Sequence, residues 1–237
     1  MRKFLALVAL VSSSAVVMWA ADMTPKQEAQ DRLERAGAVL QEITAAPDKG
    51  IPNEVVENAK CIAVVPKLIK AGFVFGGEHG RGVATCRLAS GGWSAPAFFT
   101  ISGGSWGAQI GVEGVDLVMM IMNDQGMQHL MSNKFKVGGE ASASAGPVGR
   151  HASADTDWKA GTEMLTYSRS KGLFAGISLN GSWVARDADA IDAMYGSNVA
   201  TNSILGGKIQ APAGSDPFVA EVKTMESHVN AEKTNPK

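Results

Sequence analysis

The sequence is poor in the features on which nucleic-acid-binding proteins and metalloenzymes depend. Its formal net charge is only -1, from 22 basic and 23 acidic residues, so there is no overall basic charge to attract nucleic acid. It has two cysteines and four histidines, without a CxxC pair or a histidine spacing typical of a metal site. We therefore expect no nucleic-acid partner, no metal and no cofactor.

Aromatic residues are also scarce, whereas glycine is abundant. Two Tyr, five Trp and eight Phe stand against 27 Gly, and glycine permits tight turns and close backbone approach. Hydrophobic residues make up 45% and charged residues 19%, a balance that can fill a core and excludes a wholly disordered chain. The composition favours a globular protein built on a β-sheet.

Residues 1–21 have the order of a secretory signal peptide. Arg2 and Lys3 precede apolar residues that continue, with a break of three serines, to Ala21. We expect cleavage after Ala20 or Ala21 and export to the periplasm or cell envelope, or secretion. The alternative is an N-terminal membrane anchor, for which the apolar stretch is near the lower length limit.

The two cysteines, Cys61 and Cys86, both lie in strand-like surroundings. In an exported protein such a pair can close into a disulfide. The alternative is that both are buried thiols that pack as small apolar residues. The sequence leaves both open.

The remaining pattern predicts an α+β fold. Thr24, Pro25 and Gln27 form the start signal of a helix over 24–44. Short segments rich in β-branched and aromatic residues then alternate with Gly, Ser and Asn, which predicts a Gly-rich, mainly antiparallel sheet that is curved or barrel-like, with short flanking helices. We expect one domain over 22–210, followed by a tail over 211–237 with a weak helix. The expected strands are 72–77, 82–88, 93–102, 107–112, 117–122, 136–144, 163–168 and 173–184, and the other expected helices are 52–60, 124–132 and 187–195.

One segment imitates a hydrolase motif. Residues 103–107 read Gly-Gly-Ser-Trp-Gly and satisfy the G-x-S-x-G pattern, with Ser105 as the nucleophile. The residues that follow alternate as in a strand, although a nucleophile elbow needs a helix there. We therefore favour a Gly-Ser turn and a non-enzymatic protein, and we keep a serine hydrolase as an alternative; the histidines later in the chain are His129, His151 and His228.

Positive charge is locally concentrated. Residues 60–87 contain five basic residues against Glu78 alone, and a second basic group follows at Lys134, Lys136, Arg150, Arg169 and Lys171. Residues 76–82 read as a glycine-rich hairpin with Arg81 near its tip, because they lack the ending of a phosphate-binding loop. If the fold gathers both groups, they make a patch for anionic lipid; if they diverge, they are solvated faces.

Several strings resemble the SYLF domain. They are Lys70-Ala-Gly-Phe-Val-Phe-Gly-Gly-Glu78, Trp93-Ser-Ala-Pro-Ala-Phe-Phe99, Gly111-Val-Glu-Gly-Val-Asp116, Ala145-Gly-Pro-Val-Gly-Arg150 and Tyr167-Ser-Arg-Ser-Lys-Gly-Leu-Phe-Ala-Gly176. The resemblance implies a phospholipid-binding module, joined in eukaryotes to adaptors for endocytosis and actin assembly and exported alone in bacteria.

From this resemblance and the charge pattern we expect a bacterial exported protein that associates peripherally with anionic phospholipid. The expected lipid-binding residues are Lys67, Lys70, Arg81, Arg150, Arg169 and Lys171, with apolar contact from Phe73, Phe75 and Phe174. The alternative for the three aromatics is core packing. The alternative function is a structural or scaffolding envelope protein that binds another protein, whose identity the sequence does not indicate.

Overall fold

The computed structural model describes residues 23–45, 50–72, 75–106, 111–149, 161–170 and 173–234. The expected signal peptide, Phe73, Arg150 and Lys171 lie outside these residues, as do the side chains of Phe75 and Phe174.

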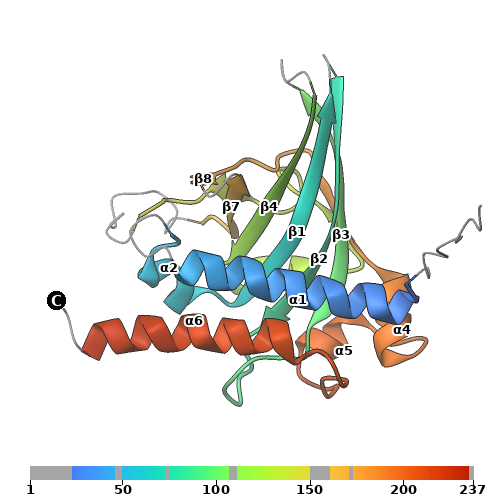
Figure 1. The fold of residues 1–237 in the computed structure, drawn as a ribbon, viewed down its shortest axis with the longest axis vertical. Helices are drawn as coiled ribbons and strands as arrows, with labels where there is room; N and C mark the ends of the chain where they lie inside the picture. Colours follow the sequence, from blue (N-terminus) through green and yellow to red (C-terminus); the bar gives the residue numbers. More distant parts are fainter. Residues whose placement is uncertain are drawn as a thin grey trace, which may run out of the picture.

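The described residues form a nine-stranded sheet with helices around it, which confirms the predicted α+β fold with a curved, mainly antiparallel sheet (Figure 1). The strand order is β5-β9-β3-β2-β1-β4-β7-β6, and β8 pairs with β7. The described pairs are antiparallel except β6 with β7. The strands are β1 Cys61–Gly72, β2 Phe75–Cys86, β3 Ala97–Trp106, β4 Gly111–Ile121, β5 Lys134–Lys136, β6 Ala143–Ala145, β7 Met164–Ser170, β8 Leu173–Gly176 and β9 Trp183–Arg186. The helices are α1 Pro25–Thr44, α2 Asn53–Asn58, α3 Asp124–Met131, α4 Ala188–Tyr195, α5 Thr201–Leu205 and α6 Asp216–Thr234.

Helix α1 begins where the sequence predicts it. The Thr24 hydroxyl accepts a hydrogen bond from the Gln27 N–H, and the Gln27 side-chain oxygen accepts one from the Thr24 backbone N–H at 2.8 Å. This capping box satisfies N–H groups that have no partner inside the helix. The helix then buries an apolar face that includes Leu33, Ala36 and Leu40, so tertiary packing adds to the local signal.

Helix α6 is longer and better packed than the weak tail helix that the sequence predicts. It buries Phe218, Val222, Met225 and Val229 and lies beside α1 across one end of the sheet (Figure 1). Gly37 of α1 permits this approach, since a Cβ there would stand 3.0 Å from the Pro217 carbonyl oxygen. Helix α6 is therefore part of the domain core.

Glu226 fastens α6 to the rest of the domain. Its carboxylate forms an ion pair with Arg87 and accepts a hydrogen bond from Trp93 Nε1 at 2.9 Å. Arg87 also donates from Nε to the Ala59 carbonyl at 2.9 Å and stacks 4.5 Å from the Trp93 ring centroid. Desolvation raises the pKa of Glu226, but the hydrogen bonds from Arg87 and Trp93 outweigh it and the pKa is lowered.

Two glycine-rich segments that the sequence predicts as turns belong to strands. Residues 76–82 lie within β2, and residues 103–106 lie within β3. A Cβ at Gly82 would stand 2.4 Å from the Phe99 ring, and one at Gly80 would stand 2.5 Å from Val65 Cγ1. These glycines let large side chains cross the strand, so here glycine serves close packing instead of a turn.

The disulfide that the sequence leaves open is present between Cys61 and Cys86, with a sulfur–sulfur distance of 2.06 Å. The two residues stand directly opposite each other in the β1–β2 pair, with their Cα atoms 4.0 Å apart. Both are fully buried. The strand register brings the two cysteines together, and this distinguishes a disulfide from two separate buried thiols.

Two other expected strands are each interrupted. The segment 136–144 contains a turn between β5 and β6, and the segment 173–184 contains an irregular stretch between β8 and β9. Gly138 and Gly181 have positive φ values of 77° and 97°, a conformation that glycine adopts without steric cost. The chain can therefore turn at each of these points.

We expect Gly82→Ala to lower the free energy of unfolding by about 1–3 kcal/mol, because the added methyl group overlaps the Phe99 ring. Denaturant unfolding measures this change. The matched control is Gly77→Ala in the same strand, where the new Cβ meets only the Gly103 carbonyl oxygen at 3.7 Å. Equal losses for the two variants would contradict the packing role of Gly82.

We expect Glu226→Gln to lower the melting temperature at neutral pH. The fall of the melting temperature with decreasing pH should also be smaller than in the parent protein. Folding lowers the pKa of the Glu226 carboxyl below its ordinary value of 4.5. The carboxylate therefore stabilises the folded protein at pH values above 4.5, and this stabilisation is lost as the pH falls through the folded-state pKa. Thermal unfolding from pH 7 downward checks this. If the melting temperature of the variant changed with pH as it does in the parent protein, the anchoring role of Glu226 would be contradicted.

Candidate functional site

The long strands divide the predicted basic residues between two faces of the sheet. Side chains alternate along β2, so Glu78 and Gly80 are buried while His79 and Arg81 are exposed. Lys70 pairs with Glu78 across β1 and β2, with its Nζ 3.7 Å from the Glu78 carboxylate. We call the face of Lys70 and Glu78 the inner face and the face of His79 and Arg81 the outer face. The structure therefore places Lys70 and Arg81 on opposite faces of the sheet, and the expected role of Lys70 in lipid binding stays a prediction.

Arg169 holds α1 against the outer face. Its guanidinium stands 3.2 Å from Asp116 on β4 and forms a second ion pair with Glu42 on α1. The Arg169 side chain is only 19% exposed. The pKa of Asp116 is raised, because the effect of burial exceeds the opposing effect of the hydrogen bond from the Lys67 N–H. Arg169 is thus held by two ion pairs, and its expected role as a lipid ligand stays a prediction.

Arg81 is half-exposed and borders α1. Its guanidinium lies 3.2 Å from the Glu28 carboxylate, and the two side chains are 54% and 46% exposed. An ion pair this open to solvent contributes little to stability and can exchange partners at low cost. Arg81 therefore remains available to an anionic ligand.

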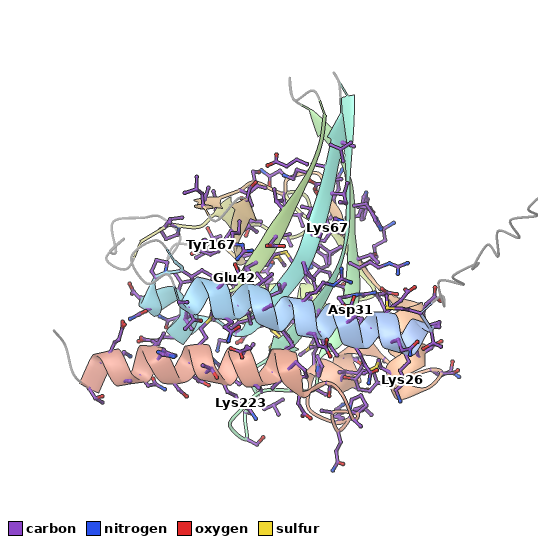
Figure 2. All side chains as sticks on the ribbon, viewed as in Figure 1. Lys26, Asp31, Glu42, Lys67, Tyr167 and Lys223 are labelled. Atoms are coloured by element: carbon purple, nitrogen blue, oxygen red, sulfur yellow. A yellow bond between two sulfur atoms is a disulfide. The ribbon has the colours of Figure 1, made fainter. Side chains whose placement is uncertain are left out.

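Lys67 occupies a β-bulge in β1. The register shifts between Val65 and Leu68, and Lys67 has a φ of 71°, which is unusual for a residue with a side chain. Its N–H donates to Asp116 Oδ1 at 3.2 Å, and its exposed side chain lies over Gly114 (Figure 2). The bulge turns this lysine outward at the cost of an unfavourable backbone conformation, which points to a function for the side chain.

Strand register adds a second group of side chains to the outer face. His79 pairs with Ser102 and Ser102 with Trp183, while Trp183 pairs with Lys136. All four positions are exposed. Lys134 lies two residues before Lys136 on the same face of β5, and the ammonium groups of Lys134 and Lys136 stand 4.4 Å and 5.7 Å from the Trp183 ring centroid.

We call the exposed set the cationic outer face. It extends over five adjacent strands, about 20 Å at roughly 4.8 Å for each strand step. The sequence marks Lys134 and Lys136 only as members of a basic group, and it gives no sign of a role for Trp183. The alternation Lys134-Phe135-Lys136, with Phe135 buried, is the signal that would have placed the two lysines on one face. The members of the set are Lys67, His79, Arg81, Lys134, Lys136 and Trp183.

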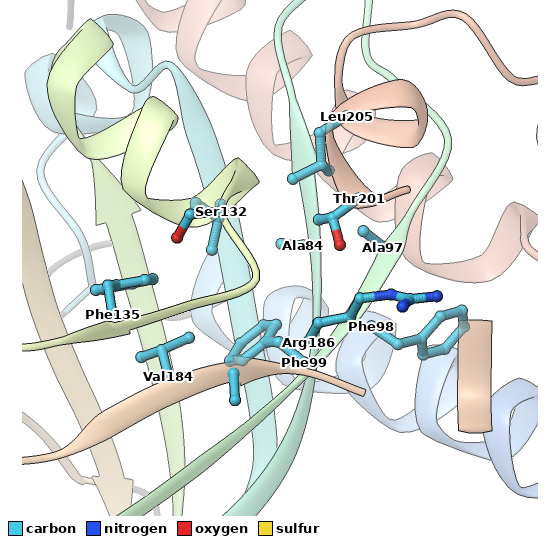
Figure 3. Close-up of a pocket in the computed structure, with 12 residues that line it drawn as sticks. Ala84, Ala97, Phe98, Phe99, Ser132, Phe135, Val184, Arg186, Thr201 and Leu205 are labelled. Atoms are coloured by element: carbon cyan, nitrogen blue, oxygen red, sulfur yellow. The ribbon is translucent and has the colours of Figure 1, made fainter. Parts of the chain in front are cut away.

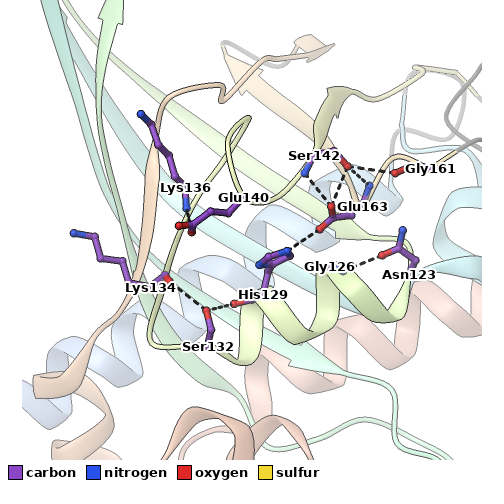
Figure 4. A network of polar contacts seen from close by, with 10 residues as sticks. All are labelled: Asn123, Gly126, His129, Ser132, Lys134, Lys136, Glu140, Ser142, Gly161 and Glu163. Carbon is purple, nitrogen blue, oxygen red and sulfur yellow. Dashed lines mark hydrogen bonds and ion pairs between the residues drawn. The ribbon is translucent and has the colours of Figure 1, made fainter.

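The hydrolase alternative does not fit the backbone. Ser105 lies inside β3 and pairs with Gly76 of β2, whereas a nucleophile elbow sits at a sharp turn from strand to helix. His129 is engaged elsewhere, with its Nε2 3.5 Å from the Glu163 carboxylate (Figure 4). Its ring centroid also lies 5.7 Å from that of Phe135. Ser142 donates to the other Glu163 carboxylate oxygen from its N–H at 3.2 Å, so this network joins α3 to the start of β7.

A pocket between β3, β9 and α5 is lined by apolar residues such as Phe99, Phe135 and Leu205 (Figure 3). Its cavity volume is about 10 Å³, room for about one water molecule. The described residues also contain no group of three or more His, Cys, Asp or Glu side chains that could hold a metal.

With respect to membranes, no helix among the described residues is long and apolar enough to span a bilayer.

Sequence comparison identifies a family and several relatives of this chain. The family model Ysc84, described as "Las17-binding protein actin regulator", matches residues 102–225. The chain is 37% identical over 175 residues to Protein YSC84 of Saccharomyces cerevisiae, covering 73% of this chain and 37% of the relative. It is 31% identical over 212 residues to SH3 domain-containing YSC84-like protein 1 of Homo sapiens, covering 84% of this chain and 62% of the relative.

The chain belongs to the Ysc84, or SYLF, family. A further yeast relative, LAS seventeen-binding protein 3, is 38% identical over 174 residues, which cover 72% of this chain and 38% of the relative. The chain thus spans less than two thirds of the length of these curated relatives. The family match runs through residue 225, so it includes the first half of α6 and agrees with the packing of that helix into the core.

The SYLF signature residue Tyr167 is structural in this chain. It is 1% exposed, and burial raises the pKa of its hydroxyl. A Cβ at Gly146 would stand 2.1 Å from the Tyr167 ring, so the glycine makes room for the aromatic side chain. Part of the family resemblance therefore reflects core packing instead of ligand contact.

Proposed function

We propose that this SYLF protein binds anionic phospholipid at a membrane surface through the cationic outer face. The observation that carries the proposal is the alignment of exposed basic side chains from β1, β2 and β5 on one side of the sheet. Lipid phosphates repeat across a flat surface, so a broad exposed sheet face suits them better than a pocket. The family resemblance to phospholipid-binding modules supports the same reading.

The local charge balance favours contact with anions. Within the described part of the chain, the ammonium groups of Lys67, Lys134 and Lys136 form no ion pair with a carboxylate. A basic side chain near an anionic membrane contributes about 1 kcal/mol, so three to four of them supply about 3–4 kcal/mol before any apolar contact. That magnitude fits reversible, salt-sensitive association.

We further propose a non-enzymatic protein of a bacterial periplasm or cell envelope, or a secreted one. The signal-peptide pattern of residues 1–21 supports export. The Cys61–Cys86 disulfide supports an oxidising compartment, since such bonds are rare where thiols are kept reduced.

We expect Lys67→Gly to reduce binding to vesicles of equal parts phosphatidylglycerol and phosphatidylcholine about fivefold, because one cation is lost. The same change relieves the positive φ at residue 67, so the melting temperature should stay equal or rise. Vesicle sedimentation and thermal unfolding measure the two effects. Lys223→Ala on α6, away from the outer face (Figure 2), is the control that removes the same charge.

The proposal is rejected if the parent protein binds phosphatidylcholine vesicles as well as mixed ones, or if Lys67→Gly and Lys223→Ala bind alike.

A second candidate is a scaffolding protein that binds another protein. The family description and the name of LAS seventeen-binding protein 3 both indicate protein partners for relatives. For this chain we expect such a role to show as partners that stay bound in a pull-down after lipid is extracted. Loss of all partners with the lipid would leave phospholipid as the ligand.

A further inference from the structure

Trp183 is exposed although the sheet around it is well packed. Its neighbour Val184 and the paired residue Phe135 fill the inner face at 2% exposure each, whereas Trp183 is 36% exposed on the outer face. The described core therefore does not depend on the indole ring. A large aromatic side chain left at the surface is typical of residues that serve binding.

Two lysines flank this ring at the edge of the sheet. The Lys134 ammonium stands 4.4 Å and the Lys136 ammonium 5.7 Å from the Trp183 ring centroid. Glu140 accepts a hydrogen bond from the Lys136 backbone N–H at 2.9 Å, and among the described residues its carboxylate forms no ion pair with the Lys136 ammonium group. The cluster thus combines one exposed indole with two ammonium groups that form no ion pair within the described part of the chain.

Lysines on an edge strand also discourage pairing with other chains. That role explains charge on β5, but it does not explain an indole on the adjacent strand β9. Tryptophan favours the boundary between lipid headgroups and acyl chains, where its ring is apolar and its N–H finds a polar partner. Lysine extends an apolar stem beside such a ring and keeps its ammonium group at the phosphates.

We infer that Trp183, Lys134 and Lys136 form an interfacial anchor that inserts the β5–β9 edge into the headgroup layer of an anionic bilayer. This inference rests on the proposed function and deepens it, since it orients the molecule. The indole enters to the depth of the acyl-chain boundary, and the two ammonium groups bind lipid phosphates beside it. Lys67 and Arg81 then lie along the same surface as longer-range electrostatic contacts.

The test uses the full chain and vesicles of equal parts phosphatidylglycerol and phosphatidylcholine, with bromine attached to the upper part of the acyl chains as a quencher of tryptophan fluorescence. We expect quenching of the parent protein and a clear loss of that quenching in Trp183→Phe. Sedimentation should show about tenfold weaker binding for Trp183→Ala, because apolar area is lost. Lys134→Gln with Lys136→Gln should weaken it more than tenfold at low salt.

Trp93→Phe is the matched aromatic control. Trp93 is 8% exposed and lies against α6, so its replacement should leave the quenching unchanged. Thermal unfolding of each variant identifies losses that come from misfolding. The Lys134→Gln, Lys136→Gln double variant retains most of each apolar side-chain stem, and Trp183→Phe retains an aromatic ring. These variants therefore test the anchor even if Trp183→Ala does not fold.

The outcomes separate the two proposals. If vesicle binding depends on Lys67 but quenching is the same with and without the indole at 183, the anchor is overturned and the proposed function stands. If the parent protein does not prefer anionic vesicles, both are overturned. Full binding by the lysine double variant also overturns the anchor.

Discussion

The two-residue period of the central strands is the constraint on which the rest of the molecule depends. Strands β2 and β3 pair through ten consecutive residues from Phe75–Trp106 to Ala84–Ala97 without a register shift. Every side chain is therefore assigned to one face by its position alone. Glu78, Gly80 and Gly82 are buried on the inner face, while His79 and Arg81 reach solvent. The same rule separates Lys70 from Arg81, Lys134 and Lys136.

A helical layer covers one end of the outer face and limits what can bind there. Arg32 of α1 forms a buried ion pair with Asp187 at 2.8 Å and lies 5.5 Å from the Phe98 ring centroid. Burial lowers the pKa of Arg32, while the hydrogen bond to Asp187 opposes this change. Such a pair costs desolvation, but breaking it is costly too, and Asp187 also caps α4 through the Ala190 N–H. The contact thus sets the position of α1, and the surface beyond it remains open to ligands.

Charge pairing then decides which basic residues can act. Arg169 has two carboxylate partners and is largely covered, whereas Lys67 is exposed on a strained bulge. Both lie in basic stretches of the sequence, and residue type alone does not tell them apart. The difference comes from Glu42 and Asp116, which lie 127 and 53 positions away in the chain. Membrane association, as proposed, would depend on a subset of the basic residues together with an indole that no sequence pattern marks.

By itself, the sequence determined the fold class, the start of α1 and the family, because capping residues, strand-forming segments and the SYLF strings are local features. Only the tertiary structure decided the disulfide, the strand conformation of residues 76–82 and 103–106, the length of α6 and the face on which each cation lies. Gly82 illustrates the reason: its role follows from Phe99, which crosses it from the neighbouring strand. Contacts of this kind depend on register, and register is set only when the whole sheet has formed.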